Sequence, residues 1–321
     1  MNESYLLFQA QYLHDSSILR WLVSIKLILA IVSIPLLIKI RKYKSEVLVH
    51  ASLSILMRFH YFYICILVFS SGVDYFMTLF WYQSVEPRDY VLSCRELFLR
   101  RFPQMIGIYG SLTSMFMMSI ERFTASSKFR TYESSRKNTV YFWTHISMVM
   151  VGLTVALLAY DCNASYPVST GVPPEGREYH QMIAAPITLI ELLTVYLFEY
   201  LFRLNTQRLK QTGFSLTERY QIAENIRILE LMRPLARFHR MVRLIATSAY
   251  LLFGRRMENG PNYPIFEESI NFVQLQGILL PLFFMRHERK ERARRIFQLQ
   301  KNSSTSGDYV ARHNAQITRG W

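Results

Sequence analysis

Runs of about 20 mostly apolar residues recur along this chain and constrain its fold more than any other feature. A helix needs about 20 such residues to cross the roughly 30 Å hydrocarbon layer of a bilayer, so each run predicts a membrane-spanning helix. Charges inside the runs are isolated, as at Lys26, Glu191 and Glu199. Six spans are predicted in this way, at residues 21–40, 47–69, 106–120, 140–159, 182–202 and 270–285.

One more span, at residues 235–253, brings the total to seven and is the sixth in chain order. It is less apolar, because it contains Arg237, Arg240 and Arg243. Cytoplasmic loops of membrane proteins are rich in Lys and Arg. With seven spans, 26 of the 37 Lys and Arg residues fall on the side of the C-terminal tail, and the N-terminus lies outside. The sequence therefore predicts an all-α, polytopic seven-helix membrane bundle. Its predicted parts are an extracellular N-terminus at 1–20, the bundle at 21–285 and a cytoplasmic basic helix and tail at 286–321.

Composition narrows the class of function. The chain is 51% hydrophobic and 19% charged, with a net charge of +14. Because the topology accounts for the excess of cations, we expect the lipid bilayer, and no nucleic acid, as a partner of the basic surface. The motifs GxSxG, GxxxxGKS/T, GxGxxG and HExxH are absent, and the eight histidines are scattered singly. We therefore expect no enzyme activity, no catalytic residue, no metal site and no cofactor.

Two kinds of covalent modification are predicted outside the membrane. Asn2 and Asn163 begin N-x-S/T triplets in outer segments, so both are candidate glycosylation sites. Cys94 and Cys162 also fall on the outer, oxidising side, where they can form a disulfide. The alternative is two free thiols. Cys65 lies inside the second span and is interpreted as a small core residue.

Several polar or aromatic groups within the membrane are candidates for ligand contact. Glu191 should face the interior of the bundle, with Arg243 or Arg58 as its partner. A structural ion pair and a ligand contact are both open. The aromatic stretch at residues 75–82 follows Gly72 and is interpreted as an interfacial cap after the second helix ends. Its aromatic side chains either line an apolar pocket or pack against neighbouring helices, and packing is favoured; they include Phe76, Phe80 and Trp81.

The third span ends at Glu121 and Arg122, at its cytoplasmic boundary. Adjacent residues on a helix do not face each other, so we expect Arg122 to reach another helix while Glu121 points elsewhere. Arg122 is then a candidate two-state latch, and an interfacial anchor is the simpler alternative. Gly107 and Gly110 on the same helix predict close packing against neighbouring backbones.

A second polar motif follows the fifth span. Ser215 and Glu218 form a capping box that begins a cytosolic helix. Its apolar residues fall on one face, and we expect a polar face, with Glu224, Asn225 and Arg227, to meet a partner. Pro234 should separate this helix from the membrane part of the sixth span.

These motifs resemble those of a known family. Glu121-Arg122-x-x-Ala125, Tyr132-Glu133 and the run from Arg219 to Arg227 (RYQxxENIR) are similar to motifs of the nematode serpentine chemoreceptors of the Sra superfamily. The similarity is nearest to class e (Sre), with class ab second. It covers the hydrophobic layout of the whole chain, but only the cytoplasmic motifs are specific. The sixth span is more polar than the family suggests, and residues 277–281 replace the Asn-Pro and Tyr found in many seven-helix receptors.

The resemblance implies a G-protein-coupled receptor fold and a chemosensory function. A small molecule would bind the outer half of the bundle, and a heterotrimeric G protein would bind the cytoplasmic face. The expected location is the plasma membrane, in the cilium of a sensory neuron. The main alternative is a transporter or channel without G-protein coupling, because arginines within spans also mark ion paths. The residues expected to form the switch and the G-protein contact are Glu121, Arg122, Arg219, Tyr220, Gln221, Glu224, Asn225 and Arg227.

Overall fold

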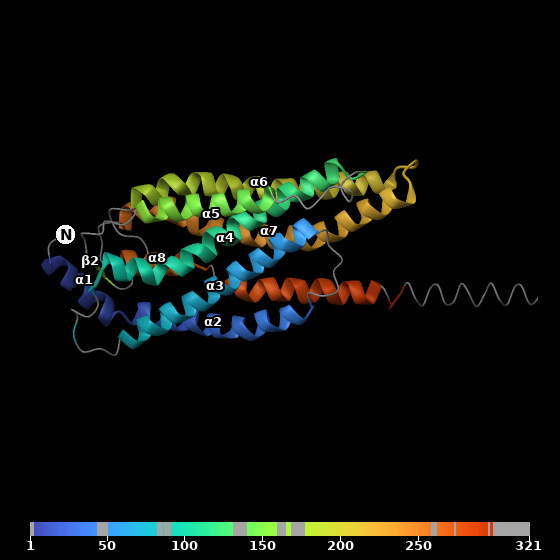
Figure 1. Cartoon of the computed structure of the whole chain (residues 1–321). Helices are drawn as coiled ribbons and strands as arrows, with labels where there is room; N and C mark the ends of the chain where they lie inside the picture. The colour runs from blue at the N-terminus through green and yellow to red at the C-terminus, as the bar shows by residue number, and fades with distance from the viewer. Residues whose placement is uncertain are drawn as a thin grey trace, which may run out of the picture.

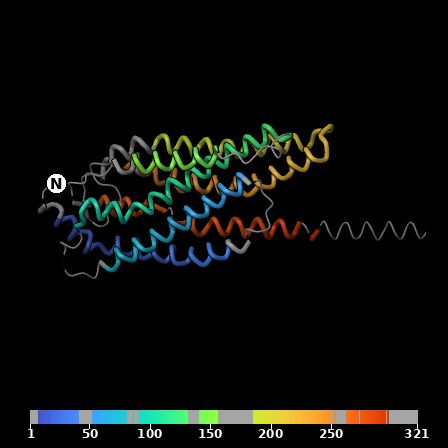
Figure 2. Tube along the Cα trace, in the orientation of Figure 1, coloured from blue at the N-terminus to red at the C-terminus, as the bar shows by residue number. Residues whose placement is uncertain are grey.

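The structure is a computed structural model that describes residues 3–43, 51–81, 86, 91–130, 140–158, 165–167, 177–257, 262–272, 274–294 and 296–297. Long helices lie side by side in one elongated bundle (Figures 1 and 2). In chain order the elements are α1 (Glu3–Asp15), α2 (Ser17–Tyr43), α3 (Ala51–Trp81), β1 (Val91–Ser93), α4 (Cys94–Ser127), α5 (Val140–Leu158), β2 (Ser165–Pro167), α6 (Arg177–Lys210), α7 (Leu216–Met257) and α8 (Tyr263–Ile270). A further helix at residues 275–294 is called the final helix.

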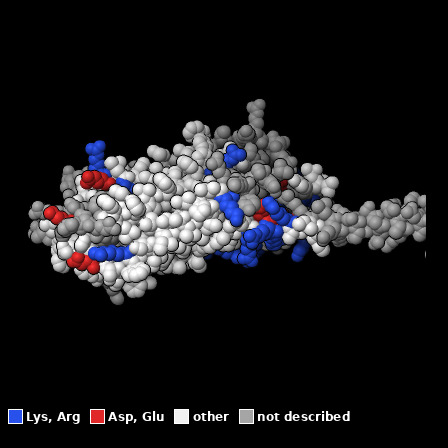
Figure 3. Space-filling view, turned by 90° about the horizontal axis from the view of Figure 1, so that it is seen from below, with Lys and Arg blue, Asp and Glu red and all other residues white. Residues whose placement is uncertain are grey.

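The helices confirm the predicted all-α membrane bundle. Four segments are long and apolar enough to cross a membrane, and α5 carries a shorter apolar segment, Val140–Val155. The helices α4 and α7 are also long enough to cross a membrane, but they carry more polar residues. Some of these polar side chains are buried inside the bundle, away from lipid. Figure 3 shows a broad uncharged band between charged residues at the two ends. The four long apolar segments are Ser17–Ile40, Ser52–Phe80, Ala185–Lys210 and Tyr263–Arg294.

The two ends of the bundle differ in charge. We call the end with the α6–α7 turn the basic end, because Lys and Arg gather there; the charge distribution predicts that it is cytoplasmic (Figure 3). The opposite end, which holds α1, is called the distal end (Figure 1).

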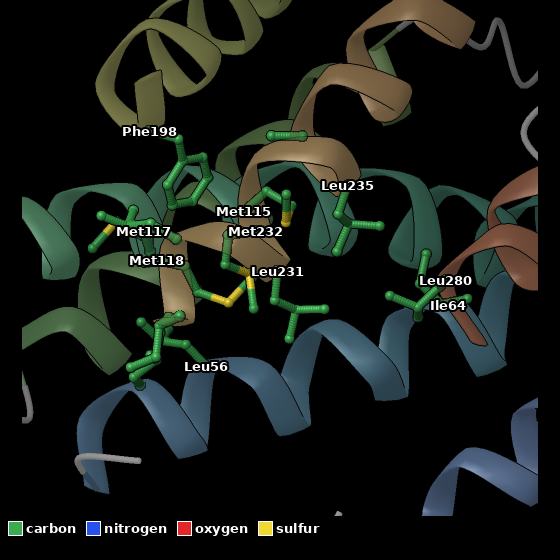
Figure 4. Close-up of a cluster of buried hydrophobic side chains, with 14 of the residues drawn as sticks. Leu56, Ile64, Met115, Met117, Met118, Phe198, Leu231, Met232, Leu235 and Leu280 are labelled. Carbon is green, nitrogen blue, oxygen red and sulfur yellow. The ribbon is translucent and has the colours of Figure 1, made fainter. Parts of the chain in front are cut away.

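Helix α4 is central to the packing, as its small residues predicted. A Cβ added at Gly107 would lie 2.7 Å from Leu67 Cβ, and one added at Gly110 would overlap the ring of Tyr63. Only glycine lets α3 and α4 approach so closely. Nearer the basic end, α3, α4, α6, α7 and the final helix enclose the main hydrophobic cluster (Figure 4). Its labelled members are Leu56, Ile64, Met115, Met117, Met118, Phe198, Leu231, Met232, Leu235 and Leu280.

Three predicted helix boundaries are wrong. The second span does not end near Gly72, because α3 continues to Trp81 and turns Phe76 and Phe80 outward, 59% and 61% exposed. These two rings therefore face the surroundings of the bundle, and neither a pocket nor a neighbouring helix. Pro234 does not break α7, since the buried residues around it, Met232 and Leu235, hold the helix in the core.

The last span is the third correction. It was predicted to run from residue 270 to residue 285, but residue 270 ends α8, and the final helix begins at residue 275 after non-helical backbone at Asn271 and Phe272. The final helix then continues without interruption past Arg286 to residue 294, so no separate helix begins at 286. Non-helical backbone at membrane depth is tolerated where protein surrounds it, and Gln274 and Gln276 after the break are both 2% exposed.

Ion pairs between α6 and α7 explain the unusual number of arginines in the sixth span. Arg233 Nη2 donates to Glu199 Oε2 at 2.7 Å, and Arg237 Nε donates to Glu199 Oε1 at 2.6 Å. Farther along the same pair of helices, Arg243 Nε lies 3.4 Å from Glu191 Oε1. Each span thus neutralises charges of the other, and of the two candidate partners of Glu191 it is Arg243 that lies beside it. The other candidate, Arg58, is exposed and forms no ion pair with a described residue.

A small layer closes the distal end. Strands β1 and β2 pair antiparallel, with Ser93 opposite Ser165. Buried residues of α1, including Ala10 and Leu13, pack with β1 and the start of α4, where Cys94 is 1% exposed. The ladder joins the chain just before Cys94 to a position three residues after Cys162. Cys162 and the two glycosylation candidates, Asn2 and Asn163, lie outside the described residues, so both modifications stay predictions.

Candidate functional site

A buried network at the basic end joins α4 to α7. The Arg122 guanidinium donates to both carboxylate oxygens of Glu121, with Nε–Oε2 at 2.6 Å and Nη2–Oε1 at 2.7 Å. Its third nitrogen, Nη1, donates to Asn225 Oδ1 of α7 at 2.8 Å. Glu121 and Arg122 are 0% and 2% exposed, so these are charge-assisted hydrogen bonds shielded from water. We call Glu121, Arg122 and Asn225 the latch.

The latch corrects one expectation and confirms another. Glu121 does not point away from Arg122, because the long arginine side chain folds back along the helix and forms a two-bond pair with its neighbour. Arg122 nevertheless reaches another helix, as predicted, through the nitrogen that the carboxylate leaves available.

The same end of α4 is bonded to α6. Asn205 Nδ2 donates to Ser126 Oγ at 2.9 Å, and Arg208 Nη1 donates to the Ser126 carbonyl oxygen at 2.5 Å. Asn205 and Ser126 are fully buried. Helix α4 is therefore tied to both α6 and α7 at the basic end, and these bonds close the space between the three helices.

The RYQxxENIR run divides between buried and exposed faces of α7. Arg219 and Tyr220 are exposed, whereas Gln221 and Glu224 are partly buried. Asn225 is buried in the latch, and Arg227 Nε lies 3.0 Å from Glu291 of the final helix. Asn225 and Arg227 are thus engaged within the bundle, contrary to the expectation that they face a partner. Tyr132 and Glu133 lie outside the described residues.

The predicted capping box at the start of α7 is confirmed. The Ser215 N–H donates to Glu218 Oε2 at 2.8 Å, and the Glu218 N–H donates to Ser215 Oγ at 3.3 Å. Arg130, beyond α4, lies 2.8 Å from Glu218 Oε1. The backbone hydrogen bond from Ser215, with a further contribution from the charge of Arg130, holds the pKa of Glu218 below its usual value.

Sequence reasoning missed a second buried network, at the distal end. Lys26 Nζ donates to Glu268 Oε2 at 2.5 Å, and Arg101 lies 3.3 Å from Asp74 and 3.8 Å from Glu268. Arg100 also pairs with Asp74. These side chains come from α2, α3, α4 and α8, so the network joins four helices. The sequence held one sign of this network, because Lys26 and Asp74 are charged residues within otherwise apolar or aromatic segments. Their ion-pair partners could not be identified from the sequence. Among the described residues, no three His, Cys, Asp or Glu side chains converge as metal ligands would.

The apolar band, the four long apolar segments of the described residues and the buried polar ties at both ends define a polytopic helical membrane protein. Its basic end is closed by hydrogen bonds between α4, α6 and α7. Comparison with known proteins gives the family. The chain belongs to the serpentine type 7TM GPCR receptor class ab chemoreceptors, whose family model matches residues 9–318.

Relatives in Caenorhabditis elegans agree with this assignment. Serpentine receptor class alpha/beta-14 is 26% identical over 174 residues, which are 51% of this chain and 44% of that protein. Serpentine receptor class beta-17 is 27% identical over 146 residues, 44% of this chain and 40% of its own length. Serpentine receptor class beta-16 is 26% identical over 203 residues, 58% and 57% of the two lengths. The chain spans about half the length of these curated relatives. Class ab therefore replaces class e as the nearest class, while the broader prediction of a nematode serpentine chemoreceptor is supported.

Proposed function

We propose that this protein is a chemosensory receptor that transmits the binding of a small molecule to a heterotrimeric G protein. Family membership supports this class of function. The observation that carries the proposal is the hydrogen bond between Arg122 of α4 and Asn225 of α7. This hydrogen bond holds α4 and α7 together at the basic end, and the two helices would have to separate there before a segment of the G protein could enter.

The latch gives the receptor a closed resting arrangement. A partner segment can enter between α4 and α7 only after the Arg122–Asn225 bond breaks. Glu121 remains bonded to Arg122 when this occurs, so the buried guanidinium keeps a counter-ion. A ligand opens the basic end to the extent that it binds the open arrangement more tightly than the closed one.

Exposed residues at the start of α7 are the proposed contact with the G protein. Arg219 and Tyr220 are exposed beside the α6–α7 turn. Gln221 and Glu224 lie on the following turn and are proposed to contribute once α7 moves. The proposed location is the plasma membrane, in the cilium of a sensory neuron, with the distal end outside.

Receptor-dependent nucleotide exchange on a heterotrimeric G protein, measured in membranes that contain the full chain, tests this proposal. We expect the double variant Arg219→Ala/Tyr220→Ala to lose most of the exchange at an unchanged amount of receptor. The matched control is Gln211→Ala, an exposed polar residue of the same turn. Equal exchange by the double variant and the control would contradict the proposed contact, and absence of receptor-dependent exchange would contradict the proposed function.

A transporter is the second candidate, because the last span is divided at Asn271 and Phe272 and broken helices line substrate sites in transporters. Uptake of the activating compound into vesicles, without nucleotide exchange, would favour that function.

The Cys94–Cys162 disulfide and glycosylation at Asn2 and Asn163 are proposed with the distal end outside. The β1–β2 ladder supports the disulfide, since Ser93 and Ser165 are paired. Peptide mapping without reductant should recover a linked pair, and two alkylated thiols would contradict it.

A further inference from the structure

Three polar side chains meet in the interior of the bundle, away from both the latch and the distal network. His60 comes from α3, His239 from α7 and Gln276 from the final helix, and their exposed fractions are 4%, 4% and 2%. The two imidazole ring centres are 5.7 Å apart, and Gln276 Nε2 is 3.5 Å from His239 Nδ1. We call these three residues the histidine site.

Each member of the histidine site has one buried polar atom with no hydrogen-bond partner among the described residues. These atoms are His60 Nε2, His239 Nε2 and Gln276 Oε1. Buried polar atoms are almost always paired, because an unpaired one loses its bond to water without replacement. Three of them in one cluster, contributed by three helices, indicate a place where a polar group from outside the chain binds.

The neighbouring bonds assign a donor or acceptor role to each atom. The Ser114 hydroxyl donates to the Ser111 carbonyl, so its oxygen accepts from His60 Nδ1–H at 2.9 Å. His60 Nε2 is then an acceptor. Gln276 Nε2 donates to His239 Nδ1, so His239 Nε2–H is a donor and Gln276 Oε1 is a second acceptor.

Charge and surroundings restrict the ligand further. Neither histidine forms an ion pair with a described carboxylate, and two protonated rings at this separation would repel each other. Arg243, one turn beyond His239 on α7, is paired with Glu191 at 3.4 Å, so its charge is balanced within the bundle. One turn from the histidines lie Ile64 and Leu235 of the hydrophobic cluster, and Ile64 and Leu280 lie next to each other between α3 and the final helix (Figure 4). A neutral polar group on an apolar skeleton therefore fits, whereas a carboxylate would face two acceptors.

We propose that His60, His239 and Gln276 bind the hydroxyl group of an uncharged, mainly apolar molecule, and that this is the ligand site of the receptor proposed above. A hydroxyl oxygen accepts from His239 Nε2–H while its proton is donated to His60 Nε2 or to Gln276 Oε1.

The site is connected to the latch through α7. His239 and Asn225 are 14 residues apart, close to four helical turns, so they lie on nearly the same face of one continuous helix. His60 is bonded to Ser114 of α4, the helix that carries Arg122. A hydroxyl that joins His60 to His239 therefore acts on the relative position of α4 and α7, which the latch also holds.

The test measures direct binding in lipid nanodiscs, so it does not depend on G-protein coupling. The probes are alcohols of six to ten carbons, each beside its methyl ether and its carboxylic acid. We expect alcohols to raise the melting temperature of the receptor at concentrations where the ethers and acids do not. In His60→Phe and His239→Phe, the half-maximal alcohol concentration should rise about 10- to 100-fold.

His145 supplies the matched control. It is a fully buried histidine on α5 whose two ring nitrogens are both bonded, to Thr113 at 3.1 Å and to Tyr63 at 3.2 Å. His145→Phe should leave the alcohol concentration unchanged. Without any alcohol it should lower the melting temperature more than His60→Phe does, because His145→Phe removes two bonded nitrogens, whereas His60→Phe removes one bonded and one unpaired nitrogen.

Three outcomes would overturn the proposal: ethers that bind as well as alcohols, no stabilisation by any alcohol, or an equal loss in His145→Phe. The proposed function is judged separately by nucleotide exchange. Exchange without alcohol binding would refute the histidine site alone, and alcohol binding without exchange would refute G-protein coupling alone.

Discussion

Removing the side-chain amide oxygen of Asn225 should raise the signalling activity of the receptor in the absence of ligand. In Asn225→Ala, Arg122 loses its hydrogen bond to Asn225 of α7 but keeps two hydrogen bonds to Glu121. No buried charge is left unpaired, so the variant should fold. Truncating Arg122 would instead leave the buried carboxylate of Glu121 without its arginine counter-ion, which makes Asn225 the better position to change.

The size of the effect follows from the kind of bond. A hydrogen bond to a charged group contributes about 1.5–3 kcal/mol, and 2 kcal/mol changes an equilibrium constant about 30-fold. If about 1% of the resting receptor has an open basic end, the variant should have about 20–25% open, because the lost bond exists only in the closed arrangement.

Ligand-free nucleotide exchange, normalised to the amount of receptor in the membrane, measures this change. Asn225→Asp retains an oxygen acceptor and should show exchange no higher than the unchanged protein. Gln211→Ala is the matched control, since Gln211 is an exposed amide of the α6–α7 turn that lies outside the latch. Unchanged basal exchange in Asn225→Ala, or an equal rise in Gln211→Ala, would refute the latch.

Three further predictions concern the bundle itself. Gly107→Ala should lower the stability of the bundle by about 1–3 kcal/mol, because the added methyl group meets Leu67. Gly72→Ala is the control and should be tolerated, since the nearest atom to a Cβ at Gly72 is 3.4 Å away. The melting temperatures of the two variants in nanodiscs test this difference. Glu268→Gln removes the carboxylate that pairs with buried Lys26 and should cost about 3–5 kcal/mol, read as loss of folded protein, and an unchanged melting temperature would contradict this value. The pKa of Glu218 is lower in the folded protein than in the unfolded chain, so its capping contribution to stability is complete above the unfolded-state pKa and is lost as the pH falls through the folded-state pKa. Amide hydrogen exchange at the start of α7 should therefore become faster at acid pH. Glu218→Gln should remove this pH dependence.

Helix boundaries show where sequence reasoning stops. Gly72 and Pro234 are ordinary helix-ending residues, yet α3 and α7 continue through both. The local cost at each position is a few kcal/mol at most, and burial of the neighbouring side chains outweighs it. The opposite error occurs in the last span, which carries no charged residue from 270 to 285 but has non-helical backbone at Asn271 and Phe272.

The candidate sites were predictable in different degrees. Arg122 was identified from its position at the end of the third span, and its need for a partner on another helix followed from its charge. That partner is Asn225, a residue 103 positions away that was itself identified but expected to face outward. The histidine site was not predicted, since His60, His239 and Gln276 are isolated in sequence and their unpaired atoms exist only after packing.

The sequence by itself determined that this chain is a helical membrane protein, how many times it crosses the bilayer, and which end is basic. These properties depend on the free energy of transferring each segment from water to lipid, which is a sum of contributions from the residues within that segment. Only the tertiary structure decided which charges pair, which polar atoms stay unpaired and which helices are tied at the basic end. Lipid solvates every apolar surface about equally, so it does not select which helices pack together. The pairing of helices depends on the directions and distances between side chains of different helices, and these are defined only in the assembled bundle.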